Sequence, residues 1–599
     1  MFHRRIRIPA SLALSVSIGA AIVTIAACGS SGNKSTVSAQ DALHTSTPIK
    51  HLVVIFGENE SFDHYFGTYP SATNPSGEPV FTAASGTPTV NGLTSALLTA
   101  NPTVSNTKNP SGTNINPFRL DRSQAATESQ NHDYTAEQLA ADGGKMDLYP
   151  LYTGNNTASS TDVFGTPGLV MGYFDGNTVT ALWNYAQNFA MSDNAYTDTY
   201  GPSTPGAISV VAGQHNGAVV TSNGAVVSVS SSNASTPPST GVINDTQGGW
   251  TLIGDLDPTG DACTIAAGTA TTAAMTSKNI GDLLNSSSIT WGGFMGGFNL
   301  QTVNANGTTG CKRSTYAPLL GQSENDFVQH HAWFQYYTST QNLAHTRPTS
   351  TALIGFTDPL DSTATPVHHQ YDVNDFFTAV NSGNFPSVSF LKAPAISDAH
   401  PGNSDPLDEQ AFVTSVVNFL EQQPDWKDTA VIVTYDDSDG WYDHQMTTPT
   451  TASFDATTTS EPLGNSTDNE TTVTGADQLS GVGSCTASGA VQGVGVNGGA
   501  VNGRCGPGTR IPFLVISPYA KSNYVDSSTV ITQASVIRFI EDNWLSGQRI
   551  GQGSDDANAG SIESLFNFST TTPVAPLYLD SSTGAKLGAA PGISLTPTL

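Results

Sequence analysis

Charged residues are scarce in this 599-residue sequence, and basic residues are the scarcest, with 21 Lys and Arg against 49 Asp and Glu. A protein that binds a nucleic-acid backbone needs a basic stripe that displaces counterions, and no such stripe is visible. We therefore expect no nucleic-acid partner. The net charge of −28 favours solubility, and the abundant Gly, Ser, Thr, Asn and Pro are common in exported proteins.

An apolar run at the N-terminus, residues 8–27, follows three arginines within the first seven residues. Basic residues, an apolar stretch and then small residues form the layout of a signal peptide, which is not a stable membrane span. We expect residues 1–28 to direct export and the small, polar residues 29–47 to form a tether.

The apolar run ends in IAACGS, where an aliphatic residue stands three places before Cys28 with small residues between. This pattern is typical of a bacterial lipoprotein cleavage site, so Cys28 would carry lipid and anchor the protein at the cell envelope or in the periplasm. The alternative is an ordinary secretory signal cut near Ala27, with a secreted product.

Cysteine is rare, and besides Cys28 the sequence has four: Cys263, Cys311, Cys485 and Cys505. An even number of cysteines in an oxidising compartment predicts disulfides. Of the three possible connectivities we choose the nearest-neighbour one, Cys263 with Cys311 and Cys485 with Cys505. None of the four has the spacing of zinc ligands.

Short apolar runs bounded by turn residues predict strands that are buried on both faces, at 51–56, 386–391, 430–435 and 511–517. Stretches with helical spacing lie between them, at 178–189, 408–422 and 533–544. This alternation predicts an α/β fold with a mostly parallel sheet covered by helices on both faces. Such sheets bind their ligands beyond the carboxyl ends of the strands.

Two segments, 216–247 and 446–508, lack helical periodicity and are rich in small and polar residues. We expect them to be surface hairpins or loops inserted into the core fold. Residues 546–599 are of the same kind and form a C-terminal extension.

Ligand-type side chains follow two of the predicted strands. Glu58 and Asn59 come directly after VVIFG, and Asp436 and Asp437 come directly after AVIVTY. Adjacent carboxylates repel each other unless a cation or a proton lies between them, and hard divalent metals prefer carboxylate and amide oxygens. These four residues are therefore candidate ligands of one metal site; the alternative is a pair of solvated acidic turns.

Ser203 lies in the segment DTYGPSTPGAISVVAG, after a tight turn at Gly201 and Pro202. A helix that starts just after this turn would direct its free amide groups at an anion beside the hydroxyl, as a nucleophile for phosphoryl transfer requires. The alternative is that Ser203 only caps the helix.

Several histidines could bind phosphoryl oxygens and protonate a leaving alkoxide near neutral pH. The candidates are His132, His330, His331 and His400. A single histidine is more often a structural residue, and we assign that role to His215, His368 and His369.

The motifs ENESFDHYFG, HDYTAEQLAADGGKMDLY, GPSTPGA, HHAWFQYY, DAHPGNSDPLDEQAFV, TYDDSDGWYDH, RIPFLVISPYA and QASVIRFIEDNW occur in this order between residues 48 and 545. In this series the chain resembles the bacterial phosphoesterase family of phosphatidylcholine-type phospholipases C and a respiratory-burst-inhibiting acid phosphatase. The resemblance implies a catalytic domain at 48–545 with a three-layer α/β/α fold like that of alkaline phosphatase.

The resemblance also implies roles for the candidate residues. Glu58, Asn59, Asp436 and Asp437 would bind one divalent metal ion, and Ser203 would be both a ligand and the nucleophile. The ligand types permit calcium, magnesium, manganese or iron and tolerate zinc. The four histidines, His132, His330, His331 and His400, would line the phosphate pocket, and His331 or His400 would protonate the leaving group. Asp63 and His64 would brace the loop.

The sequence departs from the family pattern at two positions. Ser527 stands where relatives often carry a histidine, and Glu60 stands where many carry an arginine. We expect the acidic Glu60 to make the mouth of the site less attractive to phosphate.

Two substrate classes compete for this chain. Phospholipases C act on lipid diesters and often carry C-terminal β modules, for which residues 546–599 are too few, so we expect an acid-phosphatase-like phosphomonoesterase that could also have phospholipase C activity. The runner-up from another class is a lipid-anchored binding protein without turnover, and the retention of Ser203 and both acidic pairs speaks against it.

Overall fold

The computed structural model describes residues 40, 42–456, 473–479, 485 and 491–592. The predicted signal peptide, tether and lipidated Cys28 lie outside this part of the chain, apart from the end of the tether, and stay predictions. Among the helices described, none is long and apolar enough to span a membrane.

The centre of the molecule is an eight-stranded sheet with the order β14-β11-β15-β1-β16-β19-β4-β20. The strands are β1 (His51–Gly57), β4 (Ala190–Ser192), β11 (Trp291–Met295), β14 (Gln370–Asp372), β15 (Val388–Lys392), β16 (Thr429–Tyr435), β19 (Phe513–Ile516) and β20 (Tyr524–Asp526). Only β19 runs antiparallel to its neighbours. The four predicted strands are confirmed as β1, β15, β16 and β19, and every residue of β1 and β16 is buried, as the continuous apolar runs require.

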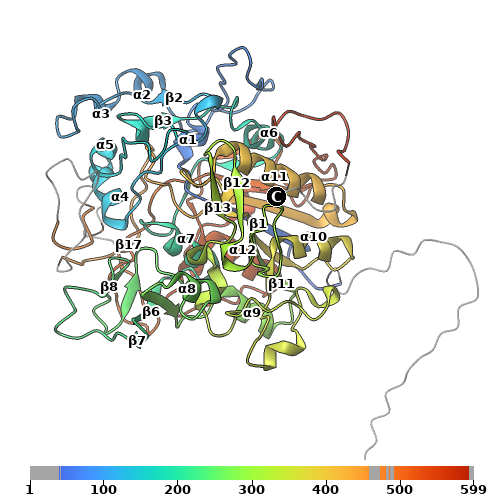
Figure 1. The fold of residues 1–599 in the computed structure, drawn as a ribbon. Helices are drawn as coiled ribbons and strands as arrows, with labels where there is room; N and C mark the ends of the chain where they lie inside the picture. The colour runs from blue at the N-terminus through green and yellow to red at the C-terminus, as the bar shows by residue number, and fades with distance from the viewer. Residues whose placement is uncertain (1–39, 41, 457–472, 480–484, 486–490, 593–599) are drawn as a thin grey trace, which may run out of the picture.

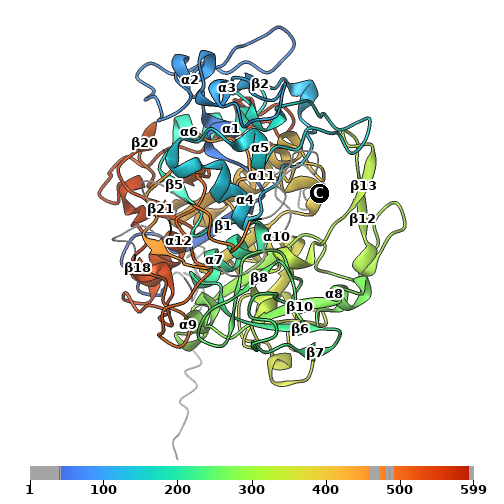
Figure 2. The ribbon, with the colours of Figure 1, turned by 90° about the vertical axis from the view of Figure 1, so that its left-hand side faces the viewer.

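The three predicted helices are confirmed as α6 (Thr180–Asn188), α11 (Pro406–Leu420) and α12 (Ala534–Trp544). In both Figure 1 and Figure 2, β1 lies between a group that contains α6 and α11 and a group that contains α12 and α7 (Ser203–Ala212). The α/β class with a mostly parallel sheet is therefore confirmed. The closer likeness to the layers of alkaline phosphatase stays a prediction.

Shorter elements complete the described fold. The other helices are α1 (Phe62–Phe66), α2 (Ser95–Thr99), α3 (Pro102–Ser105), α4 (Tyr134–Ala140), α5 (Tyr149–Tyr152), α8 (Ala262–Ala267), α9 (Ile280–Ser286) and α10 (Val373–Asn381). Small strand pairs are β2 (Phe118–Arg119) with β3 (Gly172–Tyr173), β5 (Ala195–Tyr196) with β21 (Ile531–Thr532), and β12 (Ser314–Ala317) with β13 (Gln322–Asn325).

The first predicted insertion, 216–247, belongs to a second, antiparallel sheet that extends beyond it. This sheet contains β6 (Asn216–Ser222), β7 (Ala225–Val226), β8 (Val242–Asn244), β9 (Trp250–Leu252) and β10 (Thr271–Met275). Its buried Val220, Trp250 and Leu252 join the main core. The segment is therefore a hairpin and its neighbours packed on the α/β unit rather than a surface loop throughout.

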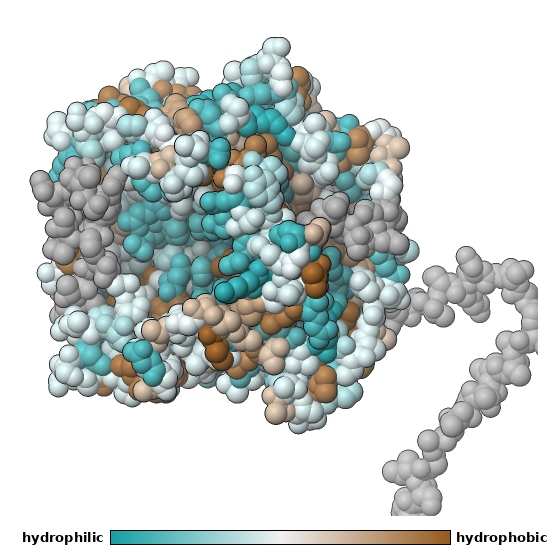
Figure 3. Space-filling view, viewed as in Figure 1, coloured by the Kyte–Doolittle hydropathy of each residue, from teal (hydrophilic) through white to brown (hydrophobic). Residues whose placement is uncertain are grey.

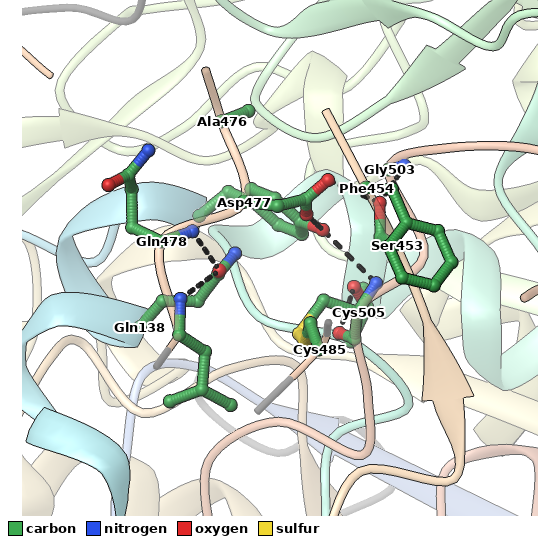
Figure 4. Close-up of a disulfide and its surroundings, with 12 residues drawn as sticks. Gln138, Ser453, Phe454, Ala476, Asp477, Gln478, Cys485, Gly503 and Cys505 are labelled. Atoms are coloured by element: carbon green, nitrogen blue, oxygen red, sulfur yellow. Dashed lines mark hydrogen bonds between the residues drawn. A yellow bond between two sulfur atoms is a disulfide. The ribbon is translucent and has the colours of Figure 1, made fainter. Parts of the chain in front are cut away.

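The second predicted insertion, 446–508, contains the short parallel pair β17 (Thr451–Ala452) and β18 (Val491–Gln492). A disulfide joins Cys485 to Cys505, with 5.5 Å between the Cα atoms. Figure 4 shows how the described residues around this disulfide reach α4, where the Gln138 side-chain oxygen accepts hydrogen bonds from the backbone N–H groups of Gln478 (2.8 Å) and Leu479 (3.0 Å).

The other disulfide joins Cys263, on α8, to Cys311, with 5.1 Å between the Cα atoms. In the C-terminal extension the buried Ile562, Leu565 and Phe566 pack on the core, and Phe566 stacks on Phe539 of α12 at 5.6 Å. The described part of the extension is therefore attached to the α/β unit. The boundaries of the predicted domains stay predictions.

Candidate active site

The two acidic pairs predicted from the sequence lie side by side. β1 pairs in parallel with β16 so that Gly57 is opposite Tyr435, and each pair follows directly at the same edge of the sheet. The Asn59 backbone N–H donates to Asp436 Oδ1 at 2.9 Å, across 377 residues of sequence. Asn59 has a φ of 63°, a left-handed conformation that Asn tolerates better than most residues.

Ser203 is the first residue of α7 and lies between these pairs. Its hydroxyl oxygen is 3.2 Å from Glu58 Oε2 and 3.2 Å from Asp437 Oδ2. The turn before it depends on Gly201, whose φ of 111° suits glycine. Gly206 on the next turn of α7 packs so closely on Asp436 that an added Cβ would lie 2.2 Å from the Asp436 carbonyl oxygen. Backbone packing therefore sets the position of the hydroxyl.

The oxygens around Ser203 fit a hard divalent cation. Asn59 Oδ1 and Asp436 Oδ2 are buried and have no hydrogen-bond partner within the described part of the chain. Burial, and then the neighbouring Asp436, raise the pKa of both Glu58 and Asp437 well above the ordinary carboxyl value. Buried oxygens without donors and carboxylates that repel each other are what a bound cation would relieve. The candidate ligands around Ser203 offer oxygen, and two neighbouring groups that include histidine, Glu58–His331–Asp398 and His132–His400–Asp439, also have the spacing to hold a metal ion. The identity of the metal therefore stays a prediction.

Lys392 and Asp398 join this cluster, and the sequence reasoning missed both. The Lys392 ammonium group contacts Glu58 Oε1 and lies 3.2 Å from Asp398 Oδ2. Burial acts to lower the pKa of Lys392, but Asp398 and Glu58 outweigh it and the pKa is raised. Two signals were present: Lys392 ends β15, the strand beside β1, and Asp398 stands two residues before the candidate His400.

His331 lies against the same carboxylate, with its Nδ1 atom 3.2 Å from Glu58 Oε1. Burial, and then the neighbouring His330, hold the pKa of His331 well below the ordinary histidine value. Its Nε2 atom is buried and has no hydrogen-bond partner among the described residues. The lowered pKa favours the neutral imidazole, and the Nε2 atom is available to a ligand.

His132 and His400 form a second histidine pair, with ring centroids 6.1 Å apart. His132 Nδ1 lies 3.2 Å from Asp439 Oδ1, and Asp439 also accepts a hydrogen bond of 3.1 Å from the Asn59 side-chain amide. Burial opposes the charged form of His132, but Asp437 and Asp439 raise its pKa well above the ordinary value. Asp439, the last carboxylate of DDSD, thus links this pair to the candidate ligands.

The His330 side chain is 29% exposed, and its residue stands beside the start of α7, where its carbonyl oxygen accepts a hydrogen bond from the Thr204 hydroxyl. Its ring nitrogens are 4.0 Å from Asp255 Oδ2 and 3.9 Å from Asp257 Oδ1. Asp255 Oδ1 in turn accepts hydrogen bonds of 2.9 Å from both the backbone N–H and the hydroxyl of Thr204, the residue after Ser203. Figure 3 shows hydrophilic residues lining a hollow in the face where Figure 1 labels α7. The structure therefore brings together all nine of the predicted site residues other than cysteines.

The prediction for Glu60 is wrong. Its side chain is 1% exposed and lies 3.6 Å from His64 Nε2, beneath the ligand loop rather than at the mouth of the site. Burial, and then Glu409, raise the pKa of Glu60 well above the ordinary value.

Ser527, the other departure from the family pattern, is exposed just after β20. Asp63 does brace the loop, because it pairs with Arg510 at 3.0 Å and with His444 at 2.6 Å.

Comparisons with known proteins agree with this geometry. The model of the Phosphoesterase family matches residues 49–545. A protein of Pseudomonas aeruginosa named non-hemolytic phospholipase C is 29% identical over 196 residues, which are 32% of this chain and 24% of that protein. Phospholipase C A of Mycobacterium tuberculosis is 24% identical over 536 residues, which are 88% of this chain and 78% of that protein.

A third relative, the non-hemolytic phospholipase C of Burkholderia pseudomallei, is 30% identical over 209 residues, or 34% of this chain and 26% of that protein. The match thus covers about a quarter of two of these relatives and more than three quarters of the mycobacterial one.

Proposed function

Because the chain belongs to the Phosphoesterase family, we propose that it is a metal-dependent hydrolase of phosphoric esters with Ser203 as its nucleophile. The observation that carries the proposal is the position of the Ser203 hydroxyl, 3.2 Å from two carboxylates that follow neighbouring strands. Beside them lie the buried Asn59 Oδ1 and Asp436 Oδ2, which lack donors in the described chain. A hydroxyl held between carboxylates at the start of a helix is where a nucleophile for phosphoryl transfer is needed.

The residues of the chain would share the work as follows. Glu58, Asn59, Asp436, Asp437 and Ser203 would hold the cation, which when bound supplies positive charge that favours the serine alkoxide and neutralises the phosphoryl group. Ser203 Oγ attacks phosphorus in line, and its proton passes to an adjacent carboxylate. A new Oγ–P bond forms as the bond from phosphorus to the departing oxygen breaks. Of the two histidines predicted to act as the acid, we propose that His400 protonates that oxygen, because the lowered pKa of His331 disfavours its charged form. Water then attacks the phosphoserine, the Oγ–P bond breaks and Ser203 Oγ regains a proton.

The substrate class follows less directly from the residues. The relatives in Pseudomonas, Burkholderia and Mycobacterium are named phospholipases C, which supports a phospholipid diester as substrate. The likeness of the motifs to those of acid phosphatases supports a phosphomonoester. We propose that the site hydrolyses one or both, and a rate on p-nitrophenyl phosphorylcholine far above that on p-nitrophenyl phosphate would select the diester.

The decisive experiment compares the wild-type protein, Ser203→Ala and metal-stripped wild-type protein on these two esters. Loss of the nucleophile should lower kcat roughly a thousandfold or more on whichever ester is turned over. Dialysis against a chelator should abolish turnover, and adding back calcium, magnesium, manganese, iron or zinc one at a time should identify the cation. Full activity of Ser203→Ala, or of the metal-stripped protein, contradicts the mechanism.

A further inference from the structure

Two loops that meet only in the folded protein have to be aligned for Ser203 to face its carboxylates. Residues 198–202 lead into α7, whose first residue is the nucleophile Ser203, whereas residues 436–440 follow Tyr435 at the end of β16 and carry Asp436 and Asp437. A displacement of about 1 Å between reacting groups can cost roughly a hundredfold in rate. Two buried side chains from elsewhere in the fold contact both loops.

Glu137, on α4, is the first of these side chains and is 1% exposed. Its Oε2 atom accepts a hydrogen bond of 2.9 Å from the backbone N–H of Gly201, two residues before Ser203. Its Oε1 atom accepts one of 2.7 Å from the hydroxyl of Ser438, the residue after Asp437. One carboxylate thus joins the end of the nucleophile loop to the end of the acidic pair.

Gln533, which stands at the start of α12 and is 1% exposed, makes the corresponding connection at the other ends of the loops. Its side-chain oxygen accepts a hydrogen bond of 3.1 Å from the backbone N–H of Asp198. Its side-chain N–H₂ donates to the carbonyl oxygens of Tyr435 at 3.1 Å and Asp436 at 2.6 Å. The amide therefore uses its acceptor on one loop and its donors on the other.

We propose that Glu137 and Gln533 are positioning residues that set the distance between Ser203 and the pair Asp436–Asp437, an assignment that rests on the function proposed above. Each loop is contacted by Gln533 near its start and by Glu137 near its end. Both side chains are buried, so water would not replace a hydrogen bond that a mutation removes. Outer-shell partners of metal ligands typically contribute tenfold to a hundredfold in metal affinity or activity. Neither residue contacts the reacting atoms, so both act through the loops.

Alanine and near-isosteric variants separate positioning from simple stability. Glu137→Ala removes two hydrogen bonds to the loops, and Gln533→Ala removes three. Glu137→Gln keeps an acceptor for Gly201 and offers a donor to the Ser438 hydroxyl, so it should restore most of the rate. Gln533→Glu keeps the acceptor for Asp198 but turns an oxygen toward two carbonyl oxygens, so it should not.

Matched controls come from two buried residues that make similar contacts away from the site. Gln410 on α11 accepts a hydrogen bond of 3.0 Å from the backbone N–H of Ala181, and Glu421 accepts one of 2.8 Å from that of Leu577. Gln410→Ala and Glu421→Ala should lower Tm about as much as the test variants do, while kcat stays within about threefold of wild type.

The measurements are Tm, kcat and KM on p-nitrophenyl phosphate and p-nitrophenyl phosphorylcholine, and the affinity of the metal-stripped protein for Mn²⁺. We expect Glu137→Ala, Gln533→Ala and Gln533→Glu to lower kcat about tenfold to a hundredfold with KM changed less than about threefold, and to weaken Mn²⁺ binding about tenfold or more. Test variants that match the controls in kcat and in Mn²⁺ affinity overturn this inference alone. A wild-type protein that turns over neither ester overturns the proposed function and this role with it.

Discussion

The loops of the candidate active site and the insertion at 446–508 are held in place in different ways. At the site, bonds join residues far apart in sequence: 145 residues separate Ser203 from Glu58, and 301 separate Glu137 from Ser438. In the described part of the insertion, one disulfide closes a loop across only 20 residues. Long-range hydrogen bonds also attach it, among them those to Gln138 and Tyr134 of α4 and to Asn216 of β6, but these three residues do not contact Ser203 or its carboxylates.

This difference predicts which property a mutation in each region will change: the geometry of the active site or the stability of the fold. Many long-range hydrogen bonds, each contributing about 1 kcal/mol net, can fix angular and distance relations in several directions at once. A single covalent link contributes more free energy but constrains mainly the unfolded chain. Changes at the site should therefore alter turnover, and changes in the insertion should alter stability.

The largest expected contrast is between two aspartates changed in the same way. Asp437→Asn should lower kcat about a hundredfold or more, because it removes a negative charge and an oxygen 3.2 Å from the Ser203 hydroxyl. Asp477→Asn, in the insertion, should leave kcat within about twofold, although Asp477 also accepts a hydrogen bond, from the Tyr134 hydroxyl at 2.6 Å. Its unfolding free energy should change by about 1–2 kcal/mol.

Steady-state kinetics on p-nitrophenyl phosphate and urea unfolding of both variants test this contrast. Equal losses of kcat in Asp437→Asn and Asp477→Asn would break the comparison, since they would mean that the insertion controls the geometry of the site.

Much of the architecture could be predicted because its signals are local. The apolar runs of β1 and β16 identify buried strands, and parallel strands end at the same edge, so Glu58 and Asp436 had to be near each other. The bracket formed by Glu137 and Gln533 could not be predicted, because nothing next to either residue in sequence shows that its partners lie 64 to 335 residues away. The error at Glu60 has the same cause: only the fold shows that this side chain points beneath the loop.

The next contrast concerns the disulfide itself. The double variant Cys485→Ser/Cys505→Ser opens a loop of 20 residues and should lower the unfolding free energy by about 3 kcal/mol, with kcat unchanged within about twofold. Cys263→Ser/Cys311→Ser opens a loop of 48 residues and should cost about 4 kcal/mol.

A large fall in kcat for Cys485→Ser/Cys505→Ser alone would contradict the expectation that changes in the insertion alter stability and not turnover. The route for such an effect exists, because the Cys505 carbonyl oxygen accepts hydrogen bonds from the Thr199 hydroxyl at 3.0 Å and the Tyr200 backbone N–H at 3.3 Å, in the loop that leads to Ser203.

The effect expected to reach turnover least is a pH dependence of stability that arises in the insertion. Burial raises the pKa of Asp477 from 3.8 to about 6, so between these values the folded protein binds more protons than the unfolded chain. The contribution of this carboxyl is therefore fully present below pH 3.8 and is lost as pH rises to about 6, by up to about 3 kcal/mol. Asp477→Asn removes the titration, so its unfolding free energy relative to wild type should rise from pH 4 to pH 6 and stay level above pH 7. The curve of unfolding free energy against pH should instead run parallel to that of wild type for the cysteine double variant. If the curve of Asp477→Asn were also parallel to wild type, the Asp477 carboxyl would not have the raised pKa.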